Sequence, residues 1–334
     1  MDALSEVLKV LHLTSGVFLE VEFTAPWCVD SAPSNQAVAS FLPHAEHVVI
    51  YHLLTEGHCR VRLPDMRDSV ELGPGDLIMF PHGDAHLMGS DVHRAPVAVA
   101  NLVEPGPEGG LMRIRHGGGG ERTRFVCGFL ACEKRLCKPL LEALPRLVRV
   151  PLGENPDTRW LIAALLAGAG ETHAPRPGAE AIMGRLSELV FVESLRQYIH
   201  SLPEHELGWL AGLRDPVVGQ ALARLHQDPA RRWDVETLAR ESGLSRSALA
   251  DRFVALIGEP PMQYLTRWRL ALASRALANR NDGVARVAAD VGYDSEAAFN
   301  RAFKREFGMP PAAWRRALRA QRRADSLPAR EQPA

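Results

Sequence analysis

The last third of the chain carries one helical pattern twice, with turn glycines 49 positions apart at Gly243 and Gly292. In each copy, residues 233–253 and 287–303, apolar residues at helical spacing lead to the glycine and then to a serine before a second helix. Glycine can take the left-handed conformation that ends a helix, and a serine hydroxyl can cap the next one. One such pattern is weak evidence, because helical hairpins also arise for packing, but two in register predict a pair of helix-turn-helix units.

The segment between the copies predicts a helix that joins them. Residues 262–273 have apolar residues at helical spacing, and the two copies close with similar endings, Ile257-Gly258-Glu259-Pro260-Pro261 and Phe307-Gly308-Met309-Pro310-Pro311. On these features, residues 215–320 resemble the DNA-binding domain of the AraC family of transcription regulators. The resemblance implies two helical subdomains whose second helices enter successive major grooves of one duplex.

The resemblance also implies which residues face DNA. The groove-facing positions are Arg246, Ser247, Ala250 and Asp251 in the first unit and Glu296, Ala297, Asn300 and Arg301 in the second, with Arg246, Arg252, Arg267, Arg269, Lys304 and Arg305 as candidate phosphate contacts. Arg301 suits guanine and Asn300 suits adenine. Family members often carry larger polar or basic residues where Ala250 and Asp251 stand, so we expect sparse base reading by the first helix. A solvated basic face is the alternative for each cation.

The charge of the chain is divided between its two parts. Residues 1–214 hold 19 lysines and arginines against 26 acidic residues, a net charge of −7, whereas residues 215–334 hold 20 against 14, a net charge of +6. This division indicates that only the C-terminal part meets a polyanion such as double-stranded DNA. Chance asymmetry is the alternative.

The N-terminal part is typical of a β-structure. From about Val48 to Cys132, short apolar runs alternate with Gly/Pro/Asp turns, which predicts a small antiparallel barrel or sandwich. The glycine run at residues 116–120 lacks the Lys-Ser/Thr ending of a phosphate-binding loop, so we expect it to be the connection of a hairpin.

Residues 75–86 contain a glycine, then Pro81-His82-Gly83, then His86, which is similar to the second sequence signature of cupin barrels. With residues 13–18 and 125–128, the signature makes the N-terminal part resemble the cupin-type effector domain of AraC-family regulators. His52, His82 and His86 are therefore candidate residues of an effector pocket or an incidental metal site, with structural hydrogen bonding as the alternative.

The candidate metal ligands are too few for a cupin enzyme. Residues 51–56 contain His52 but no His-x-His and no well-placed glutamate, and an open catalytic metal site needs about three protein ligands. We therefore expect no catalytic residue, no resident cofactor and no enzymatic activity. A cupin-type metalloenzyme with an attached DNA-binding module is the alternative.

The chain has five cysteines, an odd number, and we expect them to be thiols in a cytoplasmic protein because the sequence shows neither an export signal nor a membrane-spanning run. Cys127, Cys132 and Cys137 are five residues apart, near basic residues that would lower a thiol pKa. A redox or soft-metal sensor is one hypothesis for them. Ordinary buried core cysteines are the alternative.

The expected fold is a multidomain α+β protein. Residues 1–150 form a cupin-like β-barrel, residues 151–214 a helical coupling or dimerisation segment with helices near 160–166 and 186–199, residues 215–320 an all-α double helix-turn-helix domain, and residues 321–334 a basic disordered tail. The function expected from the resemblance is a transcription activator that binds specific DNA and RNA polymerase, senses a small effector and forms a homodimer. A nucleoid-like architectural protein with little sequence preference is a further alternative.

Overall fold

The computed structural model describes residues 2–10, 13–33, 36, 45–106, 111–171, 177–203 and 205–325. They form two compact units. The first unit contains the described residues from 13 to 202, and the second contains residues 2–10 together with the described residues from 203 on. The expected boundaries at residues 150 and 214 do not coincide with this division. The described residues between 151 and 202 belong to the unit of the strands, whereas residues 205–214 belong to the unit of the C-terminal helices.

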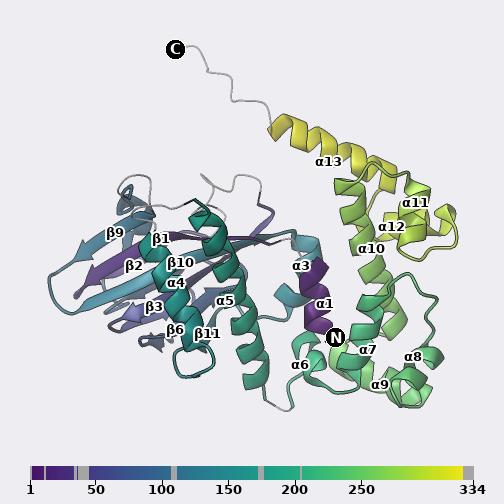
Figure 1. The fold of residues 1–334 in the computed structure, drawn as a ribbon, viewed down its shortest axis with the longest axis horizontal. Helices are drawn as coiled ribbons and strands as arrows, with labels where there is room; N and C mark the ends of the chain where they lie inside the picture. Colours follow the sequence, from purple (N-terminus) through teal and green to yellow (C-terminus); the bar gives the residue numbers. More distant parts are fainter. Residues whose placement is uncertain are drawn as a thin grey trace, which may run out of the picture. The chain divides into compact units, whose positions relative to one another are not determined.

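Two β-sheets form most of the first unit (Figure 1). One sheet has the order β11-β6-β3-β10-β1-β9 and the other β5-β4-β7-β2-β8. Their strands are β1 (Thr14–Thr24), β2 (Cys28–Ser31), β3 (His47–Glu56), β4 (Cys59–Arg62), β5 (Val70–Leu72), β6 (Asp76–Phe80), β7 (His86–Gly89), β8 (Val97–Ala98), β9 (Met112–Gly117), β10 (Arg122–Cys132) and β11 (Val148–Pro151), with a 3-10 turn η1 at Val99–Asn101. The prediction of a β-domain is confirmed, although it began at Val48 and missed β1 and β2.

The core of this unit lies between the sheets. The first sheet contributes Leu54, Phe80 and Phe125, and the second contributes Val61 and Met88. Because helices cover the other face of the first sheet, its central strand β3 is buried on both faces, which explains why every residue from Val48 to Leu54 except His52 is apolar or aromatic.

The prediction that residues 116–120 join a hairpin is wrong. Strand β1 lies between β9 and β10, pairing parallel to β9 and antiparallel to β10. The glycine run instead crosses the end of β1, where Gly118 N donates to Thr24 O at 2.9 Å and Gly120 N donates to Ala25 O at 2.8 Å. A Cβ at Gly118 would lie 2.4 Å from Pro26, so this close crossing favours glycine.

Helices α3 (Lys134–Glu142), α4 (Arg159–Glu171) and α5 (Ala179–Ser201) complete the first unit. The two helices expected near residues 160 and 186 are therefore confirmed. Helix α5 contacts β1 and β10 of the first sheet and packs beside α4 (Figure 1). Ser15 donates a hydrogen bond to Gly184 O at 2.7 Å, and the Tyr51 hydroxyl donates to Ser187 Oγ at 2.8 Å, so α5 is attached to β1 and β3.

The second unit is entirely helical in the residues described. It contains α1 (Ala3–Val10), α6 (Trp209–Arg214), α7 (Val218–Gln227), α8 (Val235–Glu241), α9 (Arg246–Ile257), α10 (Pro261–Asn279), α11 (Val284–Asp290), α12 (Glu296–Phe307) and α13 (Pro311–Asp325). Helix α1 packs against α7, which sequence reasoning did not foresee. The expected tail differs because α13 continues to Asp325, and residues 326–334 lie outside the described residues.

The repeated sequence pattern forms two similar subdomains, α8–α9 and α11–α12, joined by α10 (Figure 1). Each second helix ends at a glycine with positive φ, Gly258 at 84° and Gly308 at 75°. The proline pair that follows then begins the next helix, at Pro261 and at Pro311. No helix in the described ranges is long and apolar enough to cross a membrane.

Candidate functional site

The turns of the two helix-turn-helix units have the geometry that their sequences predict. Gly243 and Gly292 take φ values of 73° and 86°. Ser245 Oγ accepts a hydrogen bond from Ala248 N at 3.3 Å, and Ser295 Oγ accepts one from Ala298 N at 3.2 Å. These caps fix the first turns of α9 and α12, the two candidate reading helices.

Each reading helix buries one face and exposes the other. Leu249 and Phe253 of α9 and Phe299 and Phe303 of α12 are fully buried. The predicted DNA-facing residues lie elsewhere on the helices: Arg246, Ser247, Asp251, Arg252, Glu296, Ala297, Arg301 and Lys304 are exposed, and Ala250 and Asn300 are half-buried. Both helices therefore leave side chains available to a duplex.

Several predicted phosphate contacts are already engaged within the protein. Arg252 Nε and Nη2 both bond Asp215 Oδ2, at 2.9 and 2.5 Å, and Arg267 pairs with Glu259 at 2.5 Å. Arg269 is half-buried and donates to two backbone carbonyls, so it is not a surface cation. By contrast, the described part of the chain offers Arg246, Arg301 and Lys304 no hydrogen-bond or ion-pair partner from another side chain.

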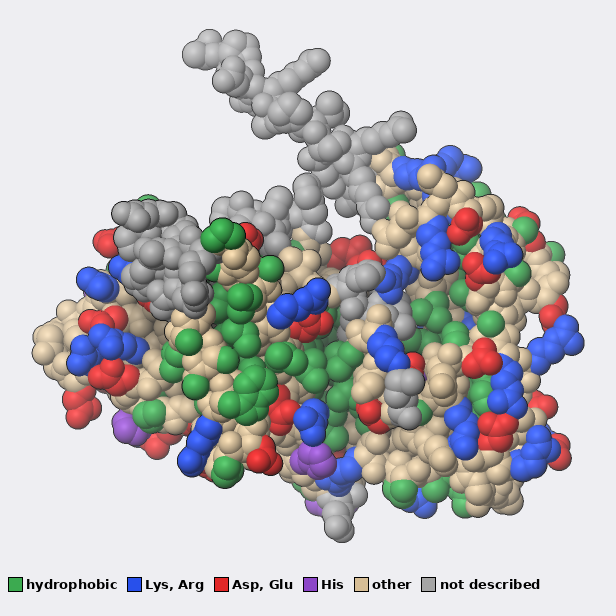
Figure 2. Space-filling view, in the orientation of Figure 1, with side chains coloured by type: hydrophobic (Ala, Val, Ile, Leu, Met, Phe, Trp, Pro, Cys, Tyr) green, Lys and Arg blue, Asp and Glu red, His purple; other side chains and the backbone are tan. Residues whose placement is uncertain are grey.

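The positive charge of the second unit is not gathered into one continuous patch on the face that Figure 2 shows. Arginine and lysine side chains there alternate with aspartate and glutamate. On this face, no broad basic surface is therefore available to a polyanion, and individual side chains of the reading helices stay the candidate contacts.

The first unit buries a chain of three polar side chains from three strands. His52 Nδ1 lies 2.8 Å from Cys127 Sγ, His52 Nε2 lies 3.0 Å from His86 Nε2, and His86 Nδ1 lies 3.1 Å from Asp84 O. A carbonyl only accepts, so His86 Nδ1 carries hydrogen and His86 Nε2 accepts from His52 Nε2. His52 Nδ1 then accepts from the Cys127 thiol. Each ring nitrogen of His52 and His86 thereby has a hydrogen-bond partner while both imidazoles are neutral.

Comparison with known proteins agrees with both units. A cupin family model matches residues 2–200, and a helix-turn-helix domain model matches residues 238–317. The chain is 35% identical to a putative AraC-like transcription regulator of Streptomyces lividans, over 95% of this chain and 98% of the relative. The chain belongs to the AraC-like transcription regulators.

Two further similarities bear on this regulator. The RCS-specific HTH-type transcriptional activator RclR of Escherichia coli K12 is 27% identical over 83% of this chain and 89% of its own. The crystal structure of the DNA-binding domain of AdpA with a target DNA is 36% identical, covers 33% of this chain and 97% of its own, and has a TM-score of 0.32. The relatives confirm the family predicted from the paired motifs, and they do not favour the alternative of a cupin metalloenzyme.

The interior of the regulator's cupin domain does not fit a metal ion. The two nitrogens of His52 point to opposite sides of its ring, so one ion cannot bind both partners of His52 at once. No three His, Cys, Asp or Glu side chains in the described ranges are placed to bind a metal together. Burial lowers the pKa of His52 well below its usual value and lowers that of His86 to about 4, which favours the neutral rings.

The remaining candidate residues of the cupin domain do not hydrogen-bond to His52 or His86. His82 Nε2 donates to Leu144 O at 2.9 Å, so the structure brings together only two of the three predicted pocket histidines. Cys132 and Cys137 are buried, and the neighbouring Cys132 thiol together with burial raises the pKa of the Cys137 thiol. Burial also raises the pKa of the Cys127 thiol, which is contrary to the expected low-pKa thiolates.

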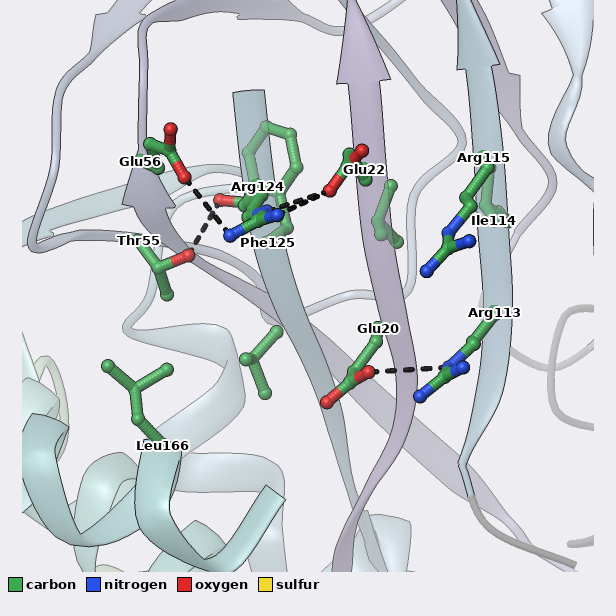
Figure 3. Close-up of a pocket in the computed structure, with 12 residues that line it drawn as sticks. Glu20, Glu22, Thr55, Glu56, Arg113, Ile114, Arg115, Arg124, Phe125 and Leu166 are labelled. Atoms are coloured by element: carbon green, nitrogen blue, oxygen red, sulfur yellow. Dashed lines mark hydrogen bonds and ion pairs between the residues drawn. The ribbon is translucent and has the colours of Figure 1, made fainter. Parts of the chain in front are cut away.

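A charged cleft of about 490 Å³ lies on the face of the first sheet beside α4 (Figure 3). Arg124 binds Glu22 at 2.7 Å and Glu56 at 3.3 Å, and Arg113 lies 3.6 Å from Glu20. Sequence reasoning missed this cleft, although alternating charged residues on β1, β9 and β10 signal an outward sheet face. Because these charges neutralise one another across neighbouring strands, they do not indicate a ligand.

Proposed function

We propose that this DNA-binding regulator activates transcription through contacts with RNA polymerase and that its cupin domain receives the signal. The observation that supports the proposal is the pair of capped reading helices, which expose Arg246 and Arg301 without partners among the described side chains. The E. coli relative RclR is named a transcriptional activator, which supports activation over repression. The regulator is in this proposal neither an enzyme nor a metalloprotein.

Selection of genomic fragments with the full-length protein tests this proposal. We expect bipartite sites bound about a thousandfold more tightly than random DNA at fixed salt. Arg301→Ala should weaken binding by about 2 kcal/mol, roughly thirtyfold, and relax specificity at one guanine, because a bidentate contact would be lost. Arg67→Ala removes an exposed arginine from the loop between β4 and β5 of the cupin domain and serves as the control.

Transcription from a selected site with purified RNA polymerase then distinguishes activation from repression. Increased transcript on adding the regulator supports activation, and decreased transcript contradicts it. Uniform binding to unrelated fragments would contradict sequence recognition and favour an architectural protein. Wild-type specificity in Arg301→Ala would contradict the role of that residue.

We propose that the signal passes from the cupin interior to α5 through β3. Neighbouring residues of β3 face opposite sides of the sheet, with His52 bonded to His86 inside and Tyr51 bonded to Ser187 of α5 outside. Because His52 and Tyr51 are adjacent in β3, a displacement of His52 in the interior can be passed through Tyr51 to α5. The test is whether Tyr51→Phe abolishes the response of DNA affinity to an effector without changing basal affinity.

Helices α4 and α5 also expose large apolar side chains, with Trp160 59%, Ile182 55% and Leu189 46% exposed. Figure 2 shows hydrophobic side chains gathered on the surface over these helices. We propose this face as the contact between two copies of the regulator, because large apolar patches mark interfaces. A monomeric mass in sedimentation equilibrium at micromolar concentration would contradict it.

The contact between Cys132 and Cys137 supports an oxidant as a second candidate signal. On oxidation by a peroxide or hypochlorous acid, one thiol would lose two electrons and the other would displace the leaving group to form a disulfide. Cys132→Ser with Cys137→Ser should then abolish any oxidant-dependent change in DNA affinity, measured by anisotropy. Cys59→Ser, which removes a buried thiol elsewhere, is the control. An unchanged oxidant response in the double variant ends this candidate.

A further inference from the structure

The loop between α7 and α8 is firmly attached to the first helix-turn-helix unit. Arg231 Nη2 binds Glu241 Oε1 of α8 at 2.5 Å, and its guanidinium lies 4.1 Å from the ring centroid of Trp233. Trp233 Nε1 in turn donates to Asp228 O at 2.9 Å. Residues 228–232, here called the bracket loop, therefore move with α8.

The linking helix α10 binds the bracket loop through Arg269. Arg269 Nε donates to Pro229 O at 2.6 Å, and its Nη2 donates to Arg231 O at 2.8 Å. Burial lowers the pKa of Arg269, so the position is costly for a cation. A half-buried guanidinium that donates twice to backbone carbonyls holds those carbonyls at a fixed place along α10.

The turn of the second helix-turn-helix unit presses against the same loop. A Cβ at Gly292 would lie 2.7 Å from Ala230 O, 2.8 Å from Ala230 Cα and 2.8 Å from Arg269 Nη2. Gly243, the matching turn glycine of the first unit, has open space within 4 Å of its Cβ position. The two repeats thus share one local conformation, but only the second turn makes a backbone contact that a side chain would break.

Arg232 and Asp294 form an ion pair across this contact at 2.7 Å. Their side chains are 85% and 78% exposed, and exposed pairs add little to stability. The orientation of the two units must therefore depend on Arg269 and on the close approach at Gly292 rather than on this pair.

We propose that Arg269 and Gly292, acting through the bracket loop, set the angle between α9 and α12, so that the regulator accepts one spacing between the two halves of its DNA site. Both are positioning residues and neither faces the duplex in this proposal. When two binding modules are held rigidly, the second binds at high effective concentration only if the DNA spacing matches. If the two helix-turn-helix units are not held rigidly, the regulator should bind DNA sites of several spacings with similar and lower affinity.

Gly292→Ala with Gly243→Ala as its matched control tests the proposal in the full-length protein. Both substitutions place alanine at a positive φ, but only the first drives a methyl group into Ala230. The probes are duplexes with the selected site, with one or two inserted base pairs between its halves, and with the second half alone. We expect the wild-type and Gly243→Ala proteins to bind the native spacing about tenfold more tightly than the altered spacings. For Gly292→Ala this preference should be less than about threefold, while its affinity for the second half-site alone stays within about twofold of wild type.

Arg269→Met gives a second variant, which keeps the side-chain length and removes both hydrogen bonds. Spin labels on keto amino acids at Ser247 and Ala297, exposed positions on α9 and α12, avoid the five native thiols. We expect a broader distance distribution in Arg269→Met than in the wild type. Wild-type spacing preference in both variants overturns the proposal, as does an equal affinity of the wild type for all spacings. Loss of half-site binding in Gly292→Ala alone would place its effect inside the second unit and would also overturn it.

Discussion

Lowering the pH from 7.5 to 5 should destabilise the helical unit by about 2 kcal/mol through buried His226. It should destabilise the cupin domain by at least about 2 kcal/mol through buried His86, to which His52 adds because burial lowers its pKa as well. His86 is 1% exposed and His226 is 5% exposed, and burial lowers the pKa of each to about 4. An unfolded histidine titrates near 6.5, so the unfolded chain takes up protons first as the pH falls. The stability is complete above pH 6.5 and is lost as the pH falls toward 4, where the total reaches about 3 kcal/mol per histidine.

Urea unfolding at the two pH values, followed by hydrogen exchange in each unit, measures this effect. His226→Gln should flatten the pH dependence of the helical unit and leave that of the cupin domain unchanged. His200→Gln removes an exposed histidine and should change neither unit. Equal losses of stability with pH in the wild-type and His226→Gln helical units would rule out His226 as the cause.

The sequence was sufficient to predict the two helix-turn-helix units because their signals are local. A turn glycine, a serine cap and apolar spacing lie within about twenty residues in each copy, and the structure confirms the helices that they imply. Strand order was harder to predict. The insertion of β1 between β9 and β10 joins residues about a hundred positions apart, and no local signal in the glycine run shows it.

The candidate sites divide in a similar way. His86 could be singled out by its motif, and the structure does turn it inward, on a strand that lies in the other sheet from β6. Its contact with His52 and the contact of His52 with Cys127 depend on how three strands pair, which spacing does not reveal. Arg269 was grouped with phosphate contacts because a sequence does not distinguish an inward arginine from an outward one. The DNA-facing residues stay predictions.

Phe303→Ala should destabilise the second helix-turn-helix unit by about 3–5 kcal/mol, the usual cost of truncating a buried phenylalanine. Phe303 is fully buried, and its ring centroid lies 4.3 Å from that of Phe307, 5.4 Å from Phe299 and 6.2 Å from Trp314. The cavity would therefore open where α12 meets α13. Hydrogen exchange of α11 and α12 amides measures the loss, and Val254→Ala, at a 41% exposed position of α9, should stay within about 0.5 kcal/mol of wild type.

The DNA affinity of Phe303→Ala connects this stability to recognition. Helix α12 carries Arg301, so partial unfolding of the second unit should remove one half of the DNA contact while α9 keeps its own core around Phe253. Affinity for the full site should then fall toward the affinity for the first half-site alone, and salt dependence should decrease because fewer phosphates are contacted. If Phe303→Ala instead exposes α8 and α9 amides equally, the two units fold as one cooperative structure, and the expectation that this variant keeps the affinity for the first half-site would be wrong.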